Sequence, residues 1–81
     1  MNIKQFAFDY IYQNGMDVSD AETVVEEMQK DEFFSKSIKW SDDLGDYPGV
    51  FRATLMLSVK SFALKWIDAH MPQAWYREMF V

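Results

Sequence analysis

Apolar residues recur every three or four positions along most of the chain, and this is the period of an amphipathic α-helix. The first such stretch predicts a helix over residues 3–14, with Asn2 as its N-cap and Gly15 as the left-handed residue that ends it. Phe8 and Tyr12 fall outside its apolar stripe and are harder to bury. The stripe has the spacing of one buried face and consists of Ile3, Phe6, Ala7, Tyr10 and Ile11.

A second helix is predicted to begin at Ser19, because "SDAE" forms a capping box in which Ser19 reaches forward and Glu22 reaches back. We expect this helix on the surface with its carboxylates outward, because its apolar stripe is narrow. That stripe consists of Ala21, Val24, Val25 and Met28. A short helix is expected within residues 31–40, where the side chains that should anchor the chain to the core are Phe33, Phe34, Ile38 and Trp40.

The stretch "SDDLGDYPG" interrupts the helical pattern before the longest element, a helix predicted from about 48 to 70. One broad apolar arc of this helix contains Phe51, Leu55, Val59, Phe62, Ala63, Trp66 and Ile67. The apolar surface extends sideways through Ala53, Leu57, Leu64 and Met71. A helix with so much apolar circumference is normally surrounded by other helices. Here either the shorter helices enclose it, or part of it meets a second chain.

The predicted fold is therefore all-α: a small single domain over residues 1–81, built as a bundle of four to five helices. Its centre is the long, largely apolar helix at about 48–70, and a last helix is expected after Pro72. Hydrophobic residues make up 49% of the chain and aromatic residues 17%, which supplies enough material for a core. The pattern indicates no strand, internal repeat or domain linker.

The net charge of −5 is unevenly distributed along the sequence. Residues 15–46 contain ten acidic residues and three lysines, so this segment carries −7. An acidic field repels phosphate groups, which disfavours nucleic acids and anionic membranes as partners and favours proteins with basic surfaces. The apolar stretch over 50–67 is too charged for a membrane span, residues 1–10 lack a signal-peptide core, and the chain has no cysteine. We therefore expect a cytoplasmic protein.

The residue types that carry catalysis or hold metals do not form a convincing group. Asp42, Asp43 and Asp46 lack the spacing of a calcium-binding loop and are expected to be turn and cap residues. His70 is the single histidine, and it is expected to interact with the negative C-terminal end of the long helix. The sequence thus predicts a protein that is not an enzyme, with no catalytic residues, cofactor or metal.

The stretch "DAETVVEEMQKDE" at residues 20–32 is the strongest candidate for a binding surface, with six carboxylates and one lysine. Carboxylates four residues apart, such as Glu22 and Glu26, repel each other by about 0.2–0.5 kcal/mol per pair. The strip is either a docking face for a partner or simply the solvated side of a helix. Aromatic residues and arginine are enriched at interfaces. The candidate partner-binding residues are Asp20, Glu22, Glu26, Glu27, Asp31, Trp40, Trp75, Tyr76 and Arg77.

In its size, its acidity and its lack of catalytic groups, the chain resembles the small accessory proteins that bacteriophages and other mobile elements encode to act on host machinery. This resemblance is one of general character, because no motif carries it. It implies a non-enzymatic module that docks on a basic surface of a host protein and inhibits or modulates it. Two alternatives remain open: a homodimeric structural or regulatory subunit that pairs through the long helix, and a weak mimic of DNA.

Overall fold

The computed structural model describes residues 1–70, except for the side chain of Ser37, and these residues form an all-α fold. The helix expected after Pro72 lies outside the described residues. Among those described, the only β-type pairing is an isolated bridge between Asn2 and Asp43. The elements are α1 (Ile3–Gln13), α2 (Val18–Lys30), α3 (Glu32–Ser37), the short 3₁₀ turn η1 (Leu44–Asp46) and α4 (Gly49–His70).

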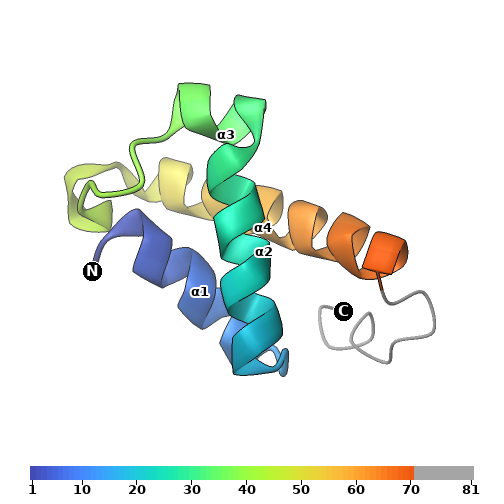
Figure 1. Ribbon diagram of the computed structural model, residues 1–81. Helices are drawn as coiled ribbons and strands as arrows, with labels where there is room; N and C mark the ends of the chain where they lie inside the picture. Colours follow the sequence, from blue (N-terminus) through green and yellow to red (C-terminus); the bar gives the residue numbers. More distant parts are fainter. Residues whose placement is uncertain (71–81) are drawn as a thin grey trace.

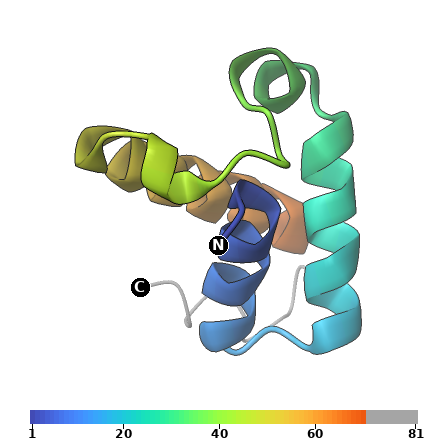
Figure 2. The same ribbon diagram turned by 90° about the vertical axis from the view of Figure 1, so that its left-hand side faces the viewer.

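Helices α1 and α2 lie side by side, run in opposite directions and pack across the long helix α4 (Figures 1 and 2). The short helix α3 follows α2 directly, and an extended segment leads from it back past the N-terminus to α4. A single cluster of buried apolar side chains joins these helices. No helix within residues 1–70 combines the length and apolar character needed to cross a membrane.

Both predicted ends of α1 are confirmed. The Oδ1 atom of Asn2 accepts a hydrogen bond from the backbone N–H of Gln5 at 2.7 Å, as an N-cap does. Gly15 has a φ angle of 103°, a left-handed conformation that favours glycine. The buried positions of α1, Ile3, Ala7 and Ile11, belong to the predicted stripe.

The predicted start of α2 is wrong. The helix begins at Val18, and Asp17 occupies the N-cap position without a capping hydrogen bond from its side chain. The carbonyl oxygen of Asp17 accepts the first helical bond, from the N–H of Ala21. Ser19 therefore lies inside the first turn, where it cannot form a capping box with Glu22. The fully buried Met16 side chain holds the chain against the core just before the helix, which explains the earlier start.

The short helix α3 forms where it was expected, but only one of its two phenylalanines is an anchor. Phe34 is buried, and its ring centroid lies 5.8 Å from those of both Trp40 and Phe62. Phe33 is 64% exposed, so the prediction that it anchors the chain is wrong. Adjacent residues on a helix point about 100° apart, and a helix of six residues offers one narrow face to the core.

The carboxylates of the loop after α3 are turn and cap residues, as predicted. Asp43 accepts hydrogen bonds from the N-terminal ammonium at 2.9 Å and from the N–H of Gly45 at 2.8 Å. These two bonds lower the pKa of Asp43. The hydroxyl of Tyr47 donates to Asp42 at 2.6 Å, and this bond raises the pKa of Tyr47. Backbone bonds from Ile3 to Asp42 and from Leu44 to Met1 complete the attachment of the loop to the start of the chain.

Helix α4 buries one side only within the described part of the chain. Its buried residues, Leu55, Val59, Ala63, Trp66 and Ile67, all belong to the predicted arc. On the opposite side, Val50 is 78% exposed and Leu57 is 68% exposed. At the C-terminal end, Nδ1 of His70 lies 2.9 Å from the carbonyl oxygen of Trp66, which confirms the expected role of this histidine at the helix end.

Candidate protein-binding groove

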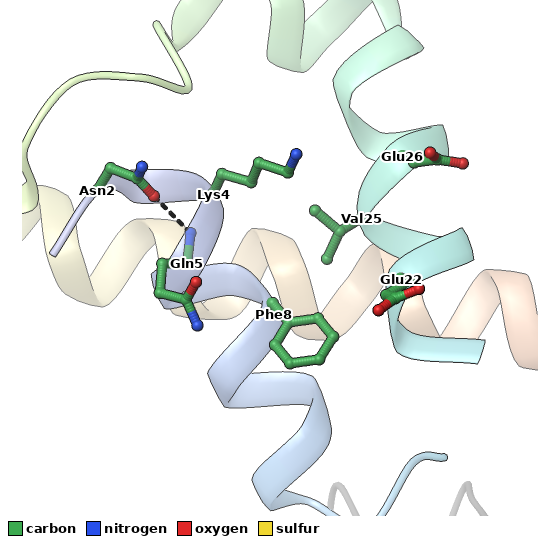
Figure 3. A pocket seen from close by; sticks show the side chains of 7 residues that line it. All are labelled: Asn2, Lys4, Gln5, Phe8, Glu22, Val25 and Glu26. Carbon is green, nitrogen blue, oxygen red and sulfur yellow. Dashed lines mark hydrogen bonds between the residues drawn. The ribbon is translucent and has the colours of Figure 1, made fainter. Parts of the chain in front are cut away.

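A surface groove runs between α1 and α2 (Figure 3) and has a volume of about 520 Å³. We call it the α1–α2 groove. Two apolar side chains face each other across it, Phe8 from α1 and Val25 from α2. Val25 belongs to the core and is only 2% exposed, so the floor of the groove is fixed by core packing. Its lining residues are Asn2, Lys4, Gln5, Phe8, Glu22, Val25 and Glu26.

The α2 side of the groove carries two exposed carboxylates, Glu22 and Glu26, which are one helical turn apart. Neither forms an ion pair within residues 1–70. In particular, Glu26 and Lys30 do not form the pair that their spacing allows. The repulsion between Glu22 and Glu26 is therefore left without a neighbouring cation in contact.

The α1 side of the groove supplies one cation and two amide groups. Lys4 extends its side chain from α1 toward α2, whereas the carboxylate of Glu26 is turned away from it (Figure 3). The amide of Gln5 donates to Asp9 at 2.8 Å, and the side-chain oxygen of Asn2 is occupied as the cap of α1. The charged groups still free to meet a ligand are therefore Lys4 on one side and the two glutamates on the other.

An aromatic surface continues from the groove along α1. The rings of Phe8 and Tyr12 are stacked with centroids 5.9 Å apart and planes 11° from parallel. Phe8 is half-buried, and Tyr12 is 49% exposed. The groove thus combines an apolar floor, an accessible aromatic pair and an acidic edge. An amphipathic basic ligand would satisfy all three features.

The other acids of the predicted strip are less available than Glu22 and Glu26. Asp20 is half-buried and already interacts within the protein. Asp31 caps α3 by accepting a hydrogen bond from the N–H of Phe33 at 3.0 Å. Glu27 is half-buried, and its Oε2 atom is inaccessible to solvent and has no hydrogen-bond partner among residues 1–70. The structure therefore distinguishes two groups of acids. Glu22 and Glu26 are exposed, whereas Asp20, Glu27 and Asp31 are partly buried.

Of the aromatic and basic candidates, only Trp40 lies within the described residues, and it is placed away from the α1–α2 groove. Trp40 packs on Phe34, and its indole Nε1 is buried without a hydrogen-bond partner in the described part of the chain. Its position is that of a side chain held against the core. The remaining candidates, Trp75, Tyr76 and Arg77, lie outside the described residues. Trp40 does not line the α1–α2 groove.

Replacing Glu27 with methionine is expected to stabilise the protein by about 1 kcal/mol, because it removes a buried oxygen that has no partner. Methionine has a similar length and helix propensity. The Glu26→Met variant is the matched control, since its carboxylate is exposed and its loss should change the free energy of unfolding little. Urea unfolding measures both variants. A Glu27→Met variant that is no more stable than the parent would show that the buried oxygen of Glu27 does not destabilise the fold.

Sequence reasoning missed Lys4, Phe8 and Val25 as groove residues. Val25 was correctly predicted to be apolar and buried, but its place in the groove depends on how close α1 lies. For Phe8, a signal existed in the sequence, because the residue lies off the buried stripe of α1 together with Tyr12. Nothing in the sequence pattern placed Lys4 opposite the glutamates of α2.

The described residues bring together no group of three or more histidine, cysteine or acidic side chains suited to hold a metal ion. Their arrangement in the groove suits recognition of a charged, partly apolar ligand. Comparison of the chain with models of known protein families, with curated proteins and with solved structures finds no match.

Proposed function

We propose that this protein is a non-enzymatic binding module whose α1–α2 groove docks on a basic, helical surface of a partner protein. By covering that surface it would inhibit or modulate the partner. One observation carries the proposal: within residues 1–70, Glu22 and Glu26 form no ion pair, and they lie one turn apart beside an apolar floor formed by Phe8 and Val25.

The partner's chemistry follows from this arrangement. An amphipathic helix presents residues three or four positions apart on one face, so lysines or arginines at that spacing can meet Glu22 and Glu26 together. An apolar residue between them would reach Phe8 and Val25. The stem of a lysine or arginine also packs well on an aromatic ring, and Phe8 and Tyr12 provide such rings. The −7 segment would speed the encounter with such a surface.

The test uses a synthetic amphipathic helical peptide. Its lysines occupy positions i, i+4 and i+7 of one helical face, and leucine lies between them on that face. We expect nuclear magnetic resonance shifts on its addition to concentrate on the residues of the α1–α2 groove. The Glu22→Gln/Glu26→Gln variant should bind the peptide about two- to thirtyfold more weakly, since it loses two charge contacts worth about 0.2–1 kcal/mol each. Affinity of the parent should fall as salt is raised.

The control variant is Glu32→Gln/Asp46→Asn, which changes the net charge equally at exposed sites away from the groove. It removes the exposed Glu32–Lys36 ion pair, which contributes little to stability. If both double variants lose affinity equally, binding reflects net charge and the groove proposal is wrong. It is also wrong if the shifted residues lie outside the groove.

A further inference from the structure

Lys4 is the charged lining residue of the α1–α2 groove to which the proposed function gives no role. It is exposed and lines the groove together with Glu22 and Glu26. Its side chain extends from α1 toward α2, while the carboxylate of Glu26 is turned away from it (Figure 3). Lys4 forms no ion pair within residues 1–70. The groove therefore offers a ligand one ammonium group as well as two carboxylates.

The first turn of α1 holds the backbone of Lys4 in a fixed place. The N–H of Lys4 donates to the carbonyl oxygen of Trp40 at 3.2 Å, and the N–H of Ile3 donates to that of Asp42 at 3.0 Å. The side chain of Ile3 is fully buried and holds the same turn on the core. Lys4 thus enters the groove from a fixed point, and a ligand meets its ammonium group at a defined end of the apolar floor.

The charges of the groove are separated by side. Among its lining residues, α2 contributes only negative charge, through Glu22 and Glu26, and α1 contributes only positive charge, through Lys4. Along the groove, Lys4 lies at the level of Glu26, and Phe8 lies at the level of Glu22 (Figure 3). A ligand that complements all three charged groups must therefore be positive toward α2 and negative toward α1.

Docking changes the surroundings of Lys4. A helix that packs on Phe8 and Val25 covers the groove and removes the ammonium group of Lys4 from water, which is unfavourable unless a counter-charge accompanies it. If Glu26 turned to Lys4, its carboxylate would be lost to the basic residues of the partner. A carboxylate on the partner resolves this conflict, because each of the three charged groups then has its own counter-ion.

We infer that Lys4 is a specificity-determining residue of the α1–α2 groove and pairs with a carboxylate of the partner. This inference rests on the proposed function and narrows the partner to one class of helix. Such a helix has an apolar stripe, basic residues along the flank that faces α2, and an acidic residue on the flank that faces α1. A helix that is basic on both flanks places a cation against Lys4, and like charges in contact disfavour the wrong partner.

Opposite charges on the two flanks also fix the direction in which the helix lies. Turning a helix end for end, with its apolar stripe kept in the groove, exchanges the flanks that face α1 and α2. A helix with lysines on one flank and glutamate on the other therefore fits in one direction. A peptide with the two flanks exchanged fits in the opposite direction.

The test compares two synthetic helical peptides that share a leucine stripe and lysines along one flank. They differ at one central position of the other flank, which is glutamate in the first peptide and glutamine in the second. The glutamate peptide should bind the parent about two- to fivefold more tightly, the range for one ion pair at the edge of an interface. Net charge predicts the reverse order, because the protein carries −5 and glutamate makes the peptide less positive.

The Lys4→Gln variant should lose the preference for the glutamate peptide. Its fold should be retained, because the side chain of Lys4 is exposed and its backbone bond to Trp40 does not depend on it. Lys65→Gln is the matched control, since it removes one positive charge at an exposed position of α4 that does not line the groove. This control should keep the preference of the parent.

Nuclear magnetic resonance separates failure of this inference from failure of the proposed function. If both peptides shift the groove residues but bind equally well, or if Lys4→Gln keeps the preference, the role of Lys4 is wrong and the groove remains a docking site. If neither peptide shifts the groove residues, both are wrong. A spin label at the peptide N-terminus should broaden opposite ends of the groove for the glutamate peptide and its flank-exchanged form. Broadening of the same end by both would contradict the inference.

Discussion

Replacing Phe34 with alanine should lower the free energy of unfolding by about 3–5 kcal/mol, as expected for a buried phenylalanine. Phe34 is 4% exposed and contacts the rings of Trp40 and Phe62, which join the loop after α3 to α4. Without it, α3 has little left to hold it, because a six-residue helix is not stable alone. In a chain of this length, a loss of this size lowers the melting temperature by at least about 12 °C.

Phe33→Ala is the matched control, since it removes the same side chain from the neighbouring position. Phe33 is 64% exposed, and the contact that it loses is an edge-on one to Phe34 at 5.5 Å. We expect a change of about 0.5–1 kcal/mol at most. Thermal unfolding followed by circular dichroism at low protein concentration compares the two variants. Equal losses would show that α3 is not anchored through Phe34.

Leu55→Ala should destabilise the protein by about 2–5 kcal/mol, the range for a buried leucine that leaves a cavity. Leu55 is 2% exposed and lies in the core face of α4 together with Val59 and Ala63. This helix is the one against which α1 and α2 both pack, so a cavity there weakens contacts with more than one element. Urea unfolding should show a lower midpoint with a similar slope.

Leu57→Ala makes the same chemical change two residues further along the same helix. Because Leu57 is 68% exposed, the variant should change the free energy of unfolding of the monomer by less than about 0.5 kcal/mol. The comparison holds residue type and helix constant and varies only burial. Comparable destabilisation by both leucine variants would refute the assignment of the buried and outer sides of α4.

The two pairs of variants also bear on the proposed function. The α1–α2 groove exists because both helices pack on α4, and Val25 in its floor belongs to the shared core. Loss of binding in Leu55→Ala would therefore reflect loss of the fold. Loss of binding in Glu22→Gln/Glu26→Gln, at exposed positions, would reflect loss of contacts with the partner.

The acids of α2 show how far sequence reasoning reaches toward the site. Around the helix, Glu22 and Glu27 lie about 110° to either side of the apolar stripe formed by Val24, Val25 and Met28. Periodicity alone therefore treats the two as equivalent. In the structure, Glu22 lines the open α1–α2 groove, whereas Glu27 has a buried oxygen. The difference comes from which neighbouring segment covers each side of α2.

By itself the sequence determined the helical class, the approximate helix spans and the buried side of each longer helix. These follow from the spacing of apolar residues, from Asn2 and Gly15 at the ends of α1, and from the interruption at 41–49, all of which act over a few residues. Only the tertiary structure decided which of two side chains with equivalent local sequence patterns is buried, as for Phe33 and Phe34. It also decided that one side of α4 stays uncovered within residues 1–70. Burial at such positions depends on contacts between elements far apart in the chain, which local periodicity does not encode.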